Sequence, residues 1–168
     1  MQNQPLCGVL LAKVEEQAEL VDALIRKLPD DRLEWTPPAG NSWNTGRLLG
    51  HLLDCFAGMC AVLYAARPDA LQHLLDLQHL TVNHDCSREE ARERIRLYSA
   101  HIAEGFSVLT DLDLARPIPT VFVPAGERLL SLILGNLEHI LNHKHELFTH
   151  LKLLGAEVGT RDLYRFRG

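Results

Sequence analysis

Residues 136–155 read NLEHILNHKHELFTHLKLLG, a stretch that combines the spacing of an amphipathic helix with four of the nine histidines of the chain. Extended back to Glu127, its apolar residues recur every three or four positions and therefore share one face of a helix. We predict a helix over residues 127–154, closed by Gly155 at its C-terminus. The residues that define its buried face are Leu129, Ile133, Ile140, Leu147, Leu151 and Leu154.

Three other segments repeat this helical spacing of apolar residues. We predict helices over residues 8–28, 44–66 and 87–109, and a short helical piece over residues 69–80. Long amphipathic helices can bury their apolar faces together only as a bundle. The predicted fold class is therefore all-α, a four-helix bundle.

The ends of these helices carry recognisable signals. Pro29 ends the first helix, because proline lacks an amide donor and disfavours helix at the residue before it. Either Ser42 or Asn44 can cap the second helix, and Ser87 opens the third with a Ser-Arg-Glu-Glu capping box.

At least two connections are long, which excludes a minimal up-down bundle with tight turns. Residues 30–41 are rich in proline and glycine, and we expect the flanking Trp35 and Trp43 to pin this loop to the core. Residues 113–126 hold three prolines, with a brief extended stretch expected at residues 120–123. The whole chain, residues 1–168, is expected to form one helical domain.

Composition narrows the function classes. The 17 basic and 22 acidic residues give a net charge of −5, which argues against nucleic-acid binding. No uninterrupted apolar run approaches the ~18 residues of a membrane span, and the N-terminal stretch lacks the pattern of a signal peptide. The four cysteines form no metal-type CxxC pair, so we expect reduced thiols in a cytoplasmic protein.

The histidines indicate a metal site. His139 and His143 lie one helical turn apart at the edge of the apolar face, so two imidazoles can reach one ion at ~2.0–2.1 Å. A third ligand must come from another helix, and His51 lies at the edge of the apolar face of the second one. Gly50 beside it allows another backbone to approach closely. Each signal has a plainer explanation, because nine histidines produce chance pairs and a histidine beside a core is more often hydrogen-bonded than metal-bound.

Five other side chains lie near these histidines in the predicted helices, and each has its own expected role. His145 lies nearly opposite the core and is expected in solvent, whereas His150 is too far along the axis to share the ion. Cys55 is a candidate fourth ligand, although such a cysteine is more often a small core residue. Asp54 is expected at solvent or an interface. Glu146 is the candidate catalytic residue, because it can accept an imidazole N–H or act as general base; its plainer reading is a solvated carboxylate.

These segments resemble the DinB/YfiT-like family of metal-dependent helical bundles. The likeness lies in the HxxxH and LKLLG parts of the last helix, in WNTGRLLGH (residues 43–51) and in TRDLYRF (residues 160–166), and it spans nearly the whole chain. It implies a four-helix bundle whose divalent ion is held by His51, His139 and His143. The chain departs from the family at residues 145–146, where members have Gly-Gln, and at Phe56, where many have a carboxylate.

Three neutral imidazoles leave a coordination position open, as in catalytic zinc sites. This donor set suits zinc, nickel, iron or copper, of which zinc and nickel are expected first. Because some DinB/YfiT-like proteins are bacillithiol S-transferases or mycothiol-dependent isomerases, the resemblance implies activation of a low-molecular-weight thiol for attack on an electrophilic substrate. Two alternatives stay open: a metal-dependent hydrolase that uses bound water, and a non-catalytic metal-binding stress-response module. The expected partners are these small molecules, and a homodimer is the assembly to test.

Overall fold

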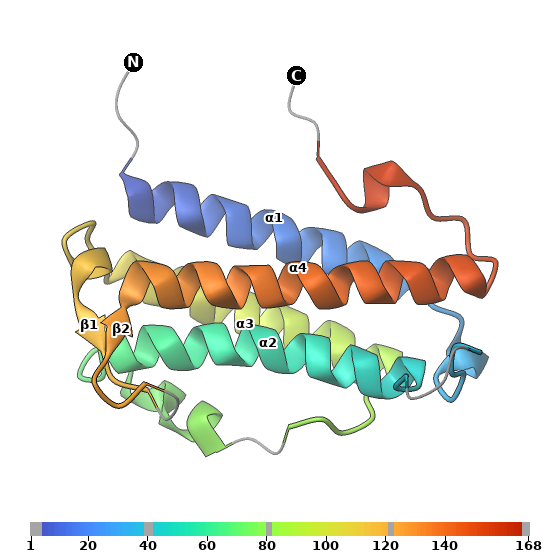
Figure 1. Cartoon of the computed structure of the whole chain (residues 1–168), viewed down its shortest axis with the longest axis horizontal. Coiled ribbons are helices and arrows are strands. Elements are labelled where there is room, and N and C mark those ends of the chain that lie inside the picture. The colour runs from blue at the N-terminus through green and yellow to red at the C-terminus, as the bar shows by residue number, and fades with distance from the viewer. Residues whose placement is uncertain (1–4, 39–41, 80–81, 121–122, 166–168) are drawn as a thin grey trace.

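The computed structural model describes residues 5–38, 42–79, 82–120 and 123–165. Within them the chain forms four α-helices that pack side by side: α1 (Leu6–Lys27), α2 (Thr45–Ala66), α3 (Arg88–Ser107) and α4 (Leu129–Leu153). In Figure 1, α4 lies in front between α1 and α2, and α3 lies behind. The predicted all-α four-helix bundle is confirmed.

Helices α2 and α3 run in the same direction, and α1 and α4 run opposite to them (Figure 1). The contacts between α2 and the start of α3 show the parallel register, since Gly46 O accepts from Cys86 N at 3.1 Å and Asp54 binds Arg94 at 2.6 Å. Residues 67–87 must therefore return along the bundle before α3 can begin. This crossover is a third long connection, in addition to the two that were predicted.

The connections contain short regular elements. The described residues include four 3₁₀ helices and one two-stranded antiparallel sheet: η1 (Asp30–Arg32), η2 (Gln72–His79), η3 (Asp113–Ala115), β1 (Pro117–Ile118), β2 (Glu127–Arg128) and η4 (Thr160–Asp162). Pro117 lies opposite Arg128, and Ile118 lies opposite Glu127.

The sheet corrects one predicted helix boundary. The last helix begins at Leu129 rather than residue 127, because residues 127 and 128 pair with β1 and cannot also adopt helical geometry. The extended stretch expected at residues 120–123 is found earlier, at residues 117–118, and residues 121 and 122 lie outside the described part of the chain.

Three predicted helix ends are confirmed. Asn44 caps α2, since its side-chain oxygen accepts from Arg47 N at 2.7 Å. Ser87 caps α3 in the same way, accepting from Glu90 N at 3.1 Å. Gly155 follows α4 with φ +80°, the left-handed conformation that glycine adopts without steric cost.

Helix α2 is the central helix of the core. Leu52, Phe56, Met59 and Leu63 are fully buried along its inner face. Averaged over 18 residues, α2 is the one helix in the described ranges that is long and apolar enough to cross a membrane, which a search for uninterrupted apolar runs missed. In the structure 61% of that window is buried inside the protein, as in the core helix of a soluble bundle.

The connection from α1 to α2 closes one end of the bundle. Trp35 O accepts hydrogen bonds from both the amide (2.9 Å) and the hydroxyl (3.1 Å) of Thr45. The Thr45 hydroxyl also lies 3.1 Å from Nδ1 of His150 on α4, and the Trp35 ring packs edge-on against the His150 ring. These contacts confirm that Trp35 helps to fix the loop, and they tie it to the two helices that carry the candidate site.

At the other end of the bundle, Asp113 organises the connection from α3 to α4. Its buried carboxylate accepts from Thr110 N (2.9 Å) and Thr110 Oγ1 (2.8 Å), and it pairs with Arg67 (2.7 Å) and Arg116 (3.0 Å). Burial raises the pKa of this carboxyl, but the hydrogen bonds from Thr110 and the two arginines outweigh burial and hold the pKa well below its ordinary value.

The contribution of Asp113 to stability should depend on pH. Because the folded-state pKa is lowered, its contribution is fully present above the unfolded-state pKa of about 4 and is lost as pH falls toward the folded-state value. Asp113→Asn should therefore lower the free energy of unfolding by about 2–3 kcal/mol at pH 7, and by progressively less below pH ~4. Urea denaturation of both proteins at pH 7, 5 and 3 measures this; the same substitution at exposed Asp69 should change little.

Candidate metal centre

Three histidines meet between α2 and α4. His51 projects from α2, and His139 and His143 project from α4. Nε2 of His51 lies 3.3 Å from Nε2 of His139. The centroid of the His143 ring lies 4.5 Å from that of His51 and 4.7 Å from that of His139. The structure thus brings together the three residues singled out from the sequence.

The spacing of the nitrogens fits a metal ion. Two imidazole nitrogens that bind one ion tetrahedrally at ~2.05 Å lie about 3.3–3.4 Å apart. The separation of 3.3 Å between His51 and His139 matches this value. One ligand atom from each of the three histidines and from Cys55 can be chosen so that all lie within 4.8 Å of one another. Small side-chain rotations therefore suffice to place three imidazoles around one ion.

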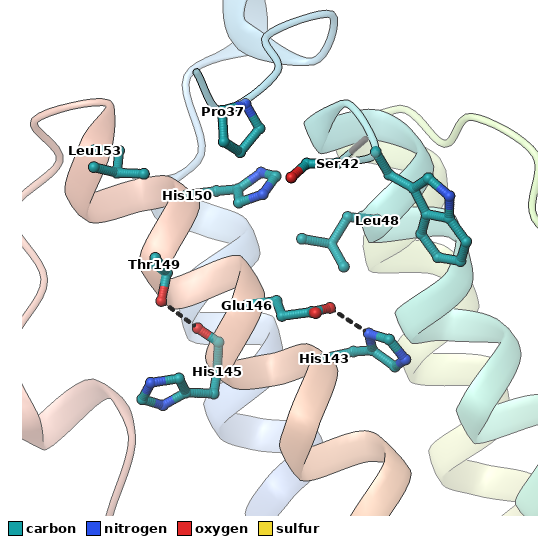
Figure 2. Close-up of a pocket in the computed structure, with 10 residues that line it drawn as sticks. Pro37, Ser42, Leu48, His143, His145, Glu146, Thr149, His150 and Leu153 are labelled. Atoms are coloured by element: carbon teal, nitrogen blue, oxygen red, sulfur yellow. Dashed lines mark hydrogen bonds and ion pairs between the residues drawn. The ribbon is translucent and has the colours of Figure 1, made fainter. Parts of the chain in front are cut away.

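The hydrogen bond between His143 and Glu146 determines which nitrogen of the His143 ring carries the proton. Nδ1 of His143 lies 2.5 Å from Oε2 of Glu146, which is one turn further along α4 (Figure 2). An ionised carboxylate can only accept, so this Nδ1 carries the proton and Nε2 keeps its lone pair. Metal-bound histidines commonly donate their second N–H to a carboxylate in this way.

Burial keeps two of the rings neutral. Burial is the largest cause lowering the pKa of His51, and the closeness of His143 adds to it, because two protonated imidazoles would repel each other. Burial likewise lowers the pKa of His139, followed by the closeness of His143 and His51. Neutral imidazole is the form that coordinates metal ions, so the packing favours ligation at neutral pH.

Cys55 belongs to this group by position but differs in chemistry. Its buried Sγ donates to the carbonyl oxygen of His51 at 3.2 Å. Burial, followed by the charge of Asp54, raises the pKa of this thiol to about 12. Metals bind the thiolate, which is strongly disfavoured here. The arrangement therefore supports a small core residue with a satisfied S–H over a fourth ligand.

Trp43, which was expected to pin the loop before α2 to the core, also packs against the candidate ligands. Its ring packs edge-on against His51 with centroids 4.8 Å apart, and it lies nearly parallel to the His143 ring at 6.4 Å. The Arg47 guanidinium lies 5.1 Å from the centroid of the Trp43 ring. Trp43 thus holds two of the imidazoles in place, and its position eight residues before His51 was the available sequence signal.

A cavity of about 570 Å³ opens beside His143 and Glu146 (Figure 2). Its walls come from α4, from the start of α2 and from the loop before α2. The lining residues are Pro37, Ser42, Trp43, Leu48, His143, His145, Glu146, Thr149, His150 and Leu153. The size is that of a small-molecule site, and its lining mixes apolar side chains with a few polar groups.

The other histidines of α4 have separate positions. His145 is exposed, as predicted, and its side chain points away from His143 (Figure 2). His150 is buried against Thr45 and Trp35, and burial lowers its pKa. On the surface of η2 and α3, His73, His101 and Glu104 form a second group of close ligand atoms, more exposed than the first.

Two buried charges were not foreseen. Asp54, expected at solvent or an interface, is instead buried between α2 and α3, because Arg94 pairs with it at 2.6 Å. Lys144 follows His143 in sequence but points to the other side of α4, where its ammonium donates to Gln17 Oε1 (2.6 Å) and Leu163 O (2.8 Å). Lys144 therefore anchors the segment after α4 and lies outside the site.

Comparison with known proteins identifies relatives of this fold. The sequence model of the DinB superfamily matches residues 13–147. No curated protein matches the chain in sequence. A DinB-like protein from Bacillus subtilis has a similar structure at 17% identity, with a TM-score of 0.66 over 87% of this chain and 92% of that one. A DinB-like protein from Bacillus cereus is similar at 16% identity, with a TM-score of 0.66 over 93% and 97% of the two chains.

A third solved structure is that of the mycothiol-dependent maleylpyruvate isomerase. It shares 11% identity with this chain, with a TM-score of 0.55 over 94% of this chain and 64% of that one. At these identities the three structures show a common fold.

The convergence of the histidines predicts which substitutions remove a metal ion. His51→Ala, His139→Ala and His143→Ala should each lose one ion per chain on dialysis, because two imidazoles hold an ion far less tightly than three. His145→Ala, on the same helix, should keep it. Metal content after dialysis against dilute zinc or nickel measures this.

Retention of the ion in all three site variants, or an equal loss of the ion in His145→Ala, would refute the ligand set. His101→Ala is the control for metal bound by the exposed group on η2 and α3.

Proposed function

We propose that this chain, which belongs to the DinB superfamily, is a metal-dependent enzyme that activates a low-molecular-weight thiol for transfer to an electrophilic substrate. His51, His139 and His143 would hold the divalent ion, zinc or nickel first. The observation that carries the proposal is the convergence of three imidazoles, of which that of His143 lines a cavity of small-molecule size. The fold shared with the mycothiol-dependent maleylpyruvate isomerase supports a thiol as the co-substrate.

A bound divalent ion would supply positive charge that lowers the pKa of a thiol or water in its open position. The chain contributes three neutral imidazoles, which leave that positive charge undiminished. Trp43 packs against the rings of His51 and His143 and helps to orient them. The Glu146 carboxylate holds the His143 ring in the tautomer whose Nε2 is available.

The chain has no reactive thiol of its own among the described residues. All four cysteines are buried, and burial raises the pKa of Cys7 to about 11 and those of Cys55, Cys60 and Cys86 to about 12. Nucleophilic attack by sulfur requires the thiolate. A thiol-dependent reaction in this protein would therefore use a thiol that enters from solution.

The cavity provides a place for the substrate beside the candidate ligands. Trp43, Leu48 and Leu153 give it apolar walls, and Glu146 and His150 supply polar groups. The Glu146 side chain is 57% exposed, so it can also reach a molecule in the cavity. This exposure favours a second candidate function, a hydrolase in which Glu146 accepts a proton from attacking water.

Localisation and assembly complete the proposal. Reduced thiols and a thiol co-substrate fit the cytoplasm, where low-molecular-weight thiols are abundant. A homodimer is the assembly that we propose to test by sedimentation.

The transferase and the hydrolase differ in whether a thiol is required. The metal-loaded protein should accelerate the reaction of cysteine, glutathione, bacillithiol or mycothiol with a chromogenic electrophile, whereas the apo protein and His143→Ala should not. Ester and amide substrates without thiol should give no turnover. Turnover of those substrates would favour the hydrolase, and absence of every activity with the metal bound would favour a non-catalytic binding module.

Glu146 variants separate an orienting role from a proton-accepting one. Glu146→Gln keeps an oxygen that accepts from His143 Nδ1 but removes the basic carboxylate, so metal affinity should fall by less than about tenfold. Glu146→Ala should weaken it by about 10–100-fold. Zinc affinity from chelator competition, with thiol-transfer rates at saturating metal, measures both roles. A normal rate in the Gln variant would exclude Glu146 as the base, whereas unaltered affinity in the Ala variant would exclude it as the orienting group.

A further inference from the structure

The end of the crossover lies directly against the turn of α2 that carries His51. A Cβ on Gly50 would lie 2.0 Å from the carbonyl oxygen of His84, so only glycine permits this approach. The amide of Cys86 donates to Gly46 O at 3.1 Å and fixes the same segment one turn earlier. Residues 82–86 are thus held close to the site by the backbone of α2. Gly50 was expected to allow another backbone to approach, and His84 supplies that backbone.

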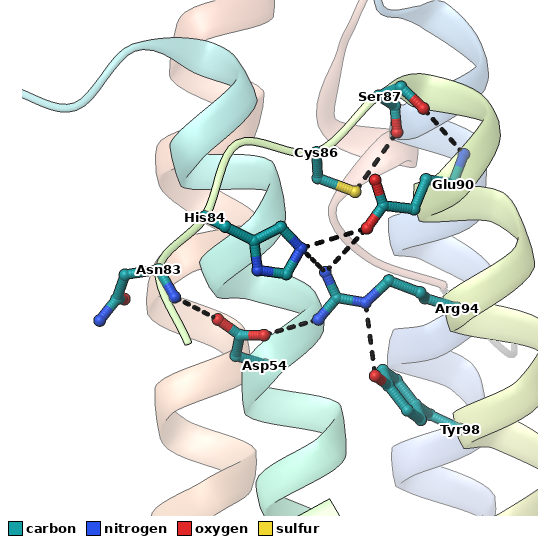
Figure 3. Close-up of polar contacts among 8 residues, drawn as sticks. All are labelled: Asp54, Asn83, His84, Cys86, Ser87, Glu90, Arg94 and Tyr98. Carbon is teal, nitrogen blue, oxygen red and sulfur yellow. Dashed lines mark hydrogen bonds and ion pairs between the residues drawn. The ribbon is translucent and has the colours of Figure 1, made fainter. Parts of the chain in front are cut away.

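Asn83 has an unusual conformation in this segment. Its φ of +61° makes it the one non-glycine residue with positive φ in the described part of the chain. Asparagine tolerates this left-handed region better than most residues, although at a cost in free energy. The backbone N–H of Asn83 donates to Oδ2 of Asp54 at 2.8 Å, while Oδ1 of Asp54 pairs with Arg94 at 2.6 Å (Figure 3).

The buried ion pair holds Asn83 in that conformation. The side chains of Asp54 and Arg94 are 5% and 12% exposed, so their interaction is shielded from water. Arg94 is further held by the Tyr98 hydroxyl at 3.4 Å (Figure 3). The Asp54 carboxylate thus joins α2, α3 and the crossover at one point, one helical turn from His51.

Two buried polar atoms remain unmatched at this point. Nδ1 of His51 and Oδ1 of Asn83 are both buried, and neither has a hydrogen-bond partner of acceptable geometry. The two residues are held near each other by the backbone, since Asn83 directly precedes His84, whose carbonyl oxygen packs against Gly50, the residue before His51. Buried polar atoms without partners are costly, so a small movement that joins this donor and acceptor is favoured.

We propose that Asn83 is a positioning residue for His51: its side-chain oxygen accepts the Nδ1 proton and leaves Nε2 for the metal ion. Nε2 is the nitrogen that faces His139, so Nδ1 is the one that needs a partner. His143 has the equivalent partner in Glu146. This inference rests on the proposed metal site and extends it to the crossover. The crossover would supply the neutral amide of Asn83 to His51, whereas α4 supplies the carboxylate of Glu146 to His143.

Two substitutions separate the side chain of Asn83 from its backbone. Asn83→Gly keeps the left-handed conformation without strain and removes the acceptor. Asn83→Asp keeps an acceptor at the same position. We expect zinc to bind Asn83→Gly about 10–100-fold more weakly than the parent protein, while the melting temperature of the apo protein changes little. The zinc affinity of Asn83→Asp should be no more than about threefold lower than that of the parent protein.

Zinc affinity is measured by competition with a chromogenic chelator at one fixed pH. Long-range ¹H–¹⁵N spectra of the zinc-loaded proteins report the tautomer of His51 directly, and Nδ1 should carry the proton in the parent and in Asn83→Asp. Equal zinc affinity in the parent and Asn83→Gly, with binding abolished in His51→Ala, would overturn the role of Asn83 and leave the metal site intact. Equal weakening in the Gly and Asp variants would also overturn it. Failure of the parent protein to bind zinc or nickel would instead overturn the proposed metal function, and the Asn83 inference with it.

Discussion

The antiparallel packing of α2 against α4 is the contact on which both the core and the candidate site depend. Leu52 and Phe56 on α2 and Ile140 and Leu147 on α4 are fully buried, and α2 packs more extensively against α4 than against any other element. Residues at the edges of two such apolar faces must meet along the seam between the helices. The three histidines occupy these edges, so the hydrophobic contact that stabilises the bundle also brings their imidazoles together.

The same packing determines the chemistry of the rings. Partial burial favours neutral imidazole, and neutral imidazole can donate a lone pair to a metal ion. Each ring then needs a partner for its second nitrogen, since a buried N–H without one is costly. Glu146 accepts from His143 across one turn of α4, and Asn83, in a distant segment, is the partner that we propose for His51. The buried pair of Asp54 and Arg94 connects that segment to α3, which makes the third helix part of the support of the site.

Features that depend on local sequence were predicted well. The four helices, the capping roles of Asn44 and Ser87 and the glycine after α4 follow from nearest-neighbour chemistry along one segment. Errors arose where a distant segment changed the outcome. The start of α4 moved by two residues because residues 127 and 128 pair with β1. Asp54 was expected at the surface because its partner, Arg94, lies 40 residues away on another helix.

The sequence by itself determined the bundle and placed the three histidines at the edges of apolar faces, because apolar periodicity, and the position of a side chain relative to it, are properties of a single helix. Only the tertiary structure decided the direction of α3, the place of Trp43 against the imidazoles and the close approach of His84 to Gly50. These depend on the crossover between α2 and α3, in which only the short helical piece found as η2 was predicted, and whose last part is placed by contacts with α2 such as that of His84 with Gly50. Contacts between segments far apart in the chain form only when the core has aligned the helices, so no local pattern encodes them.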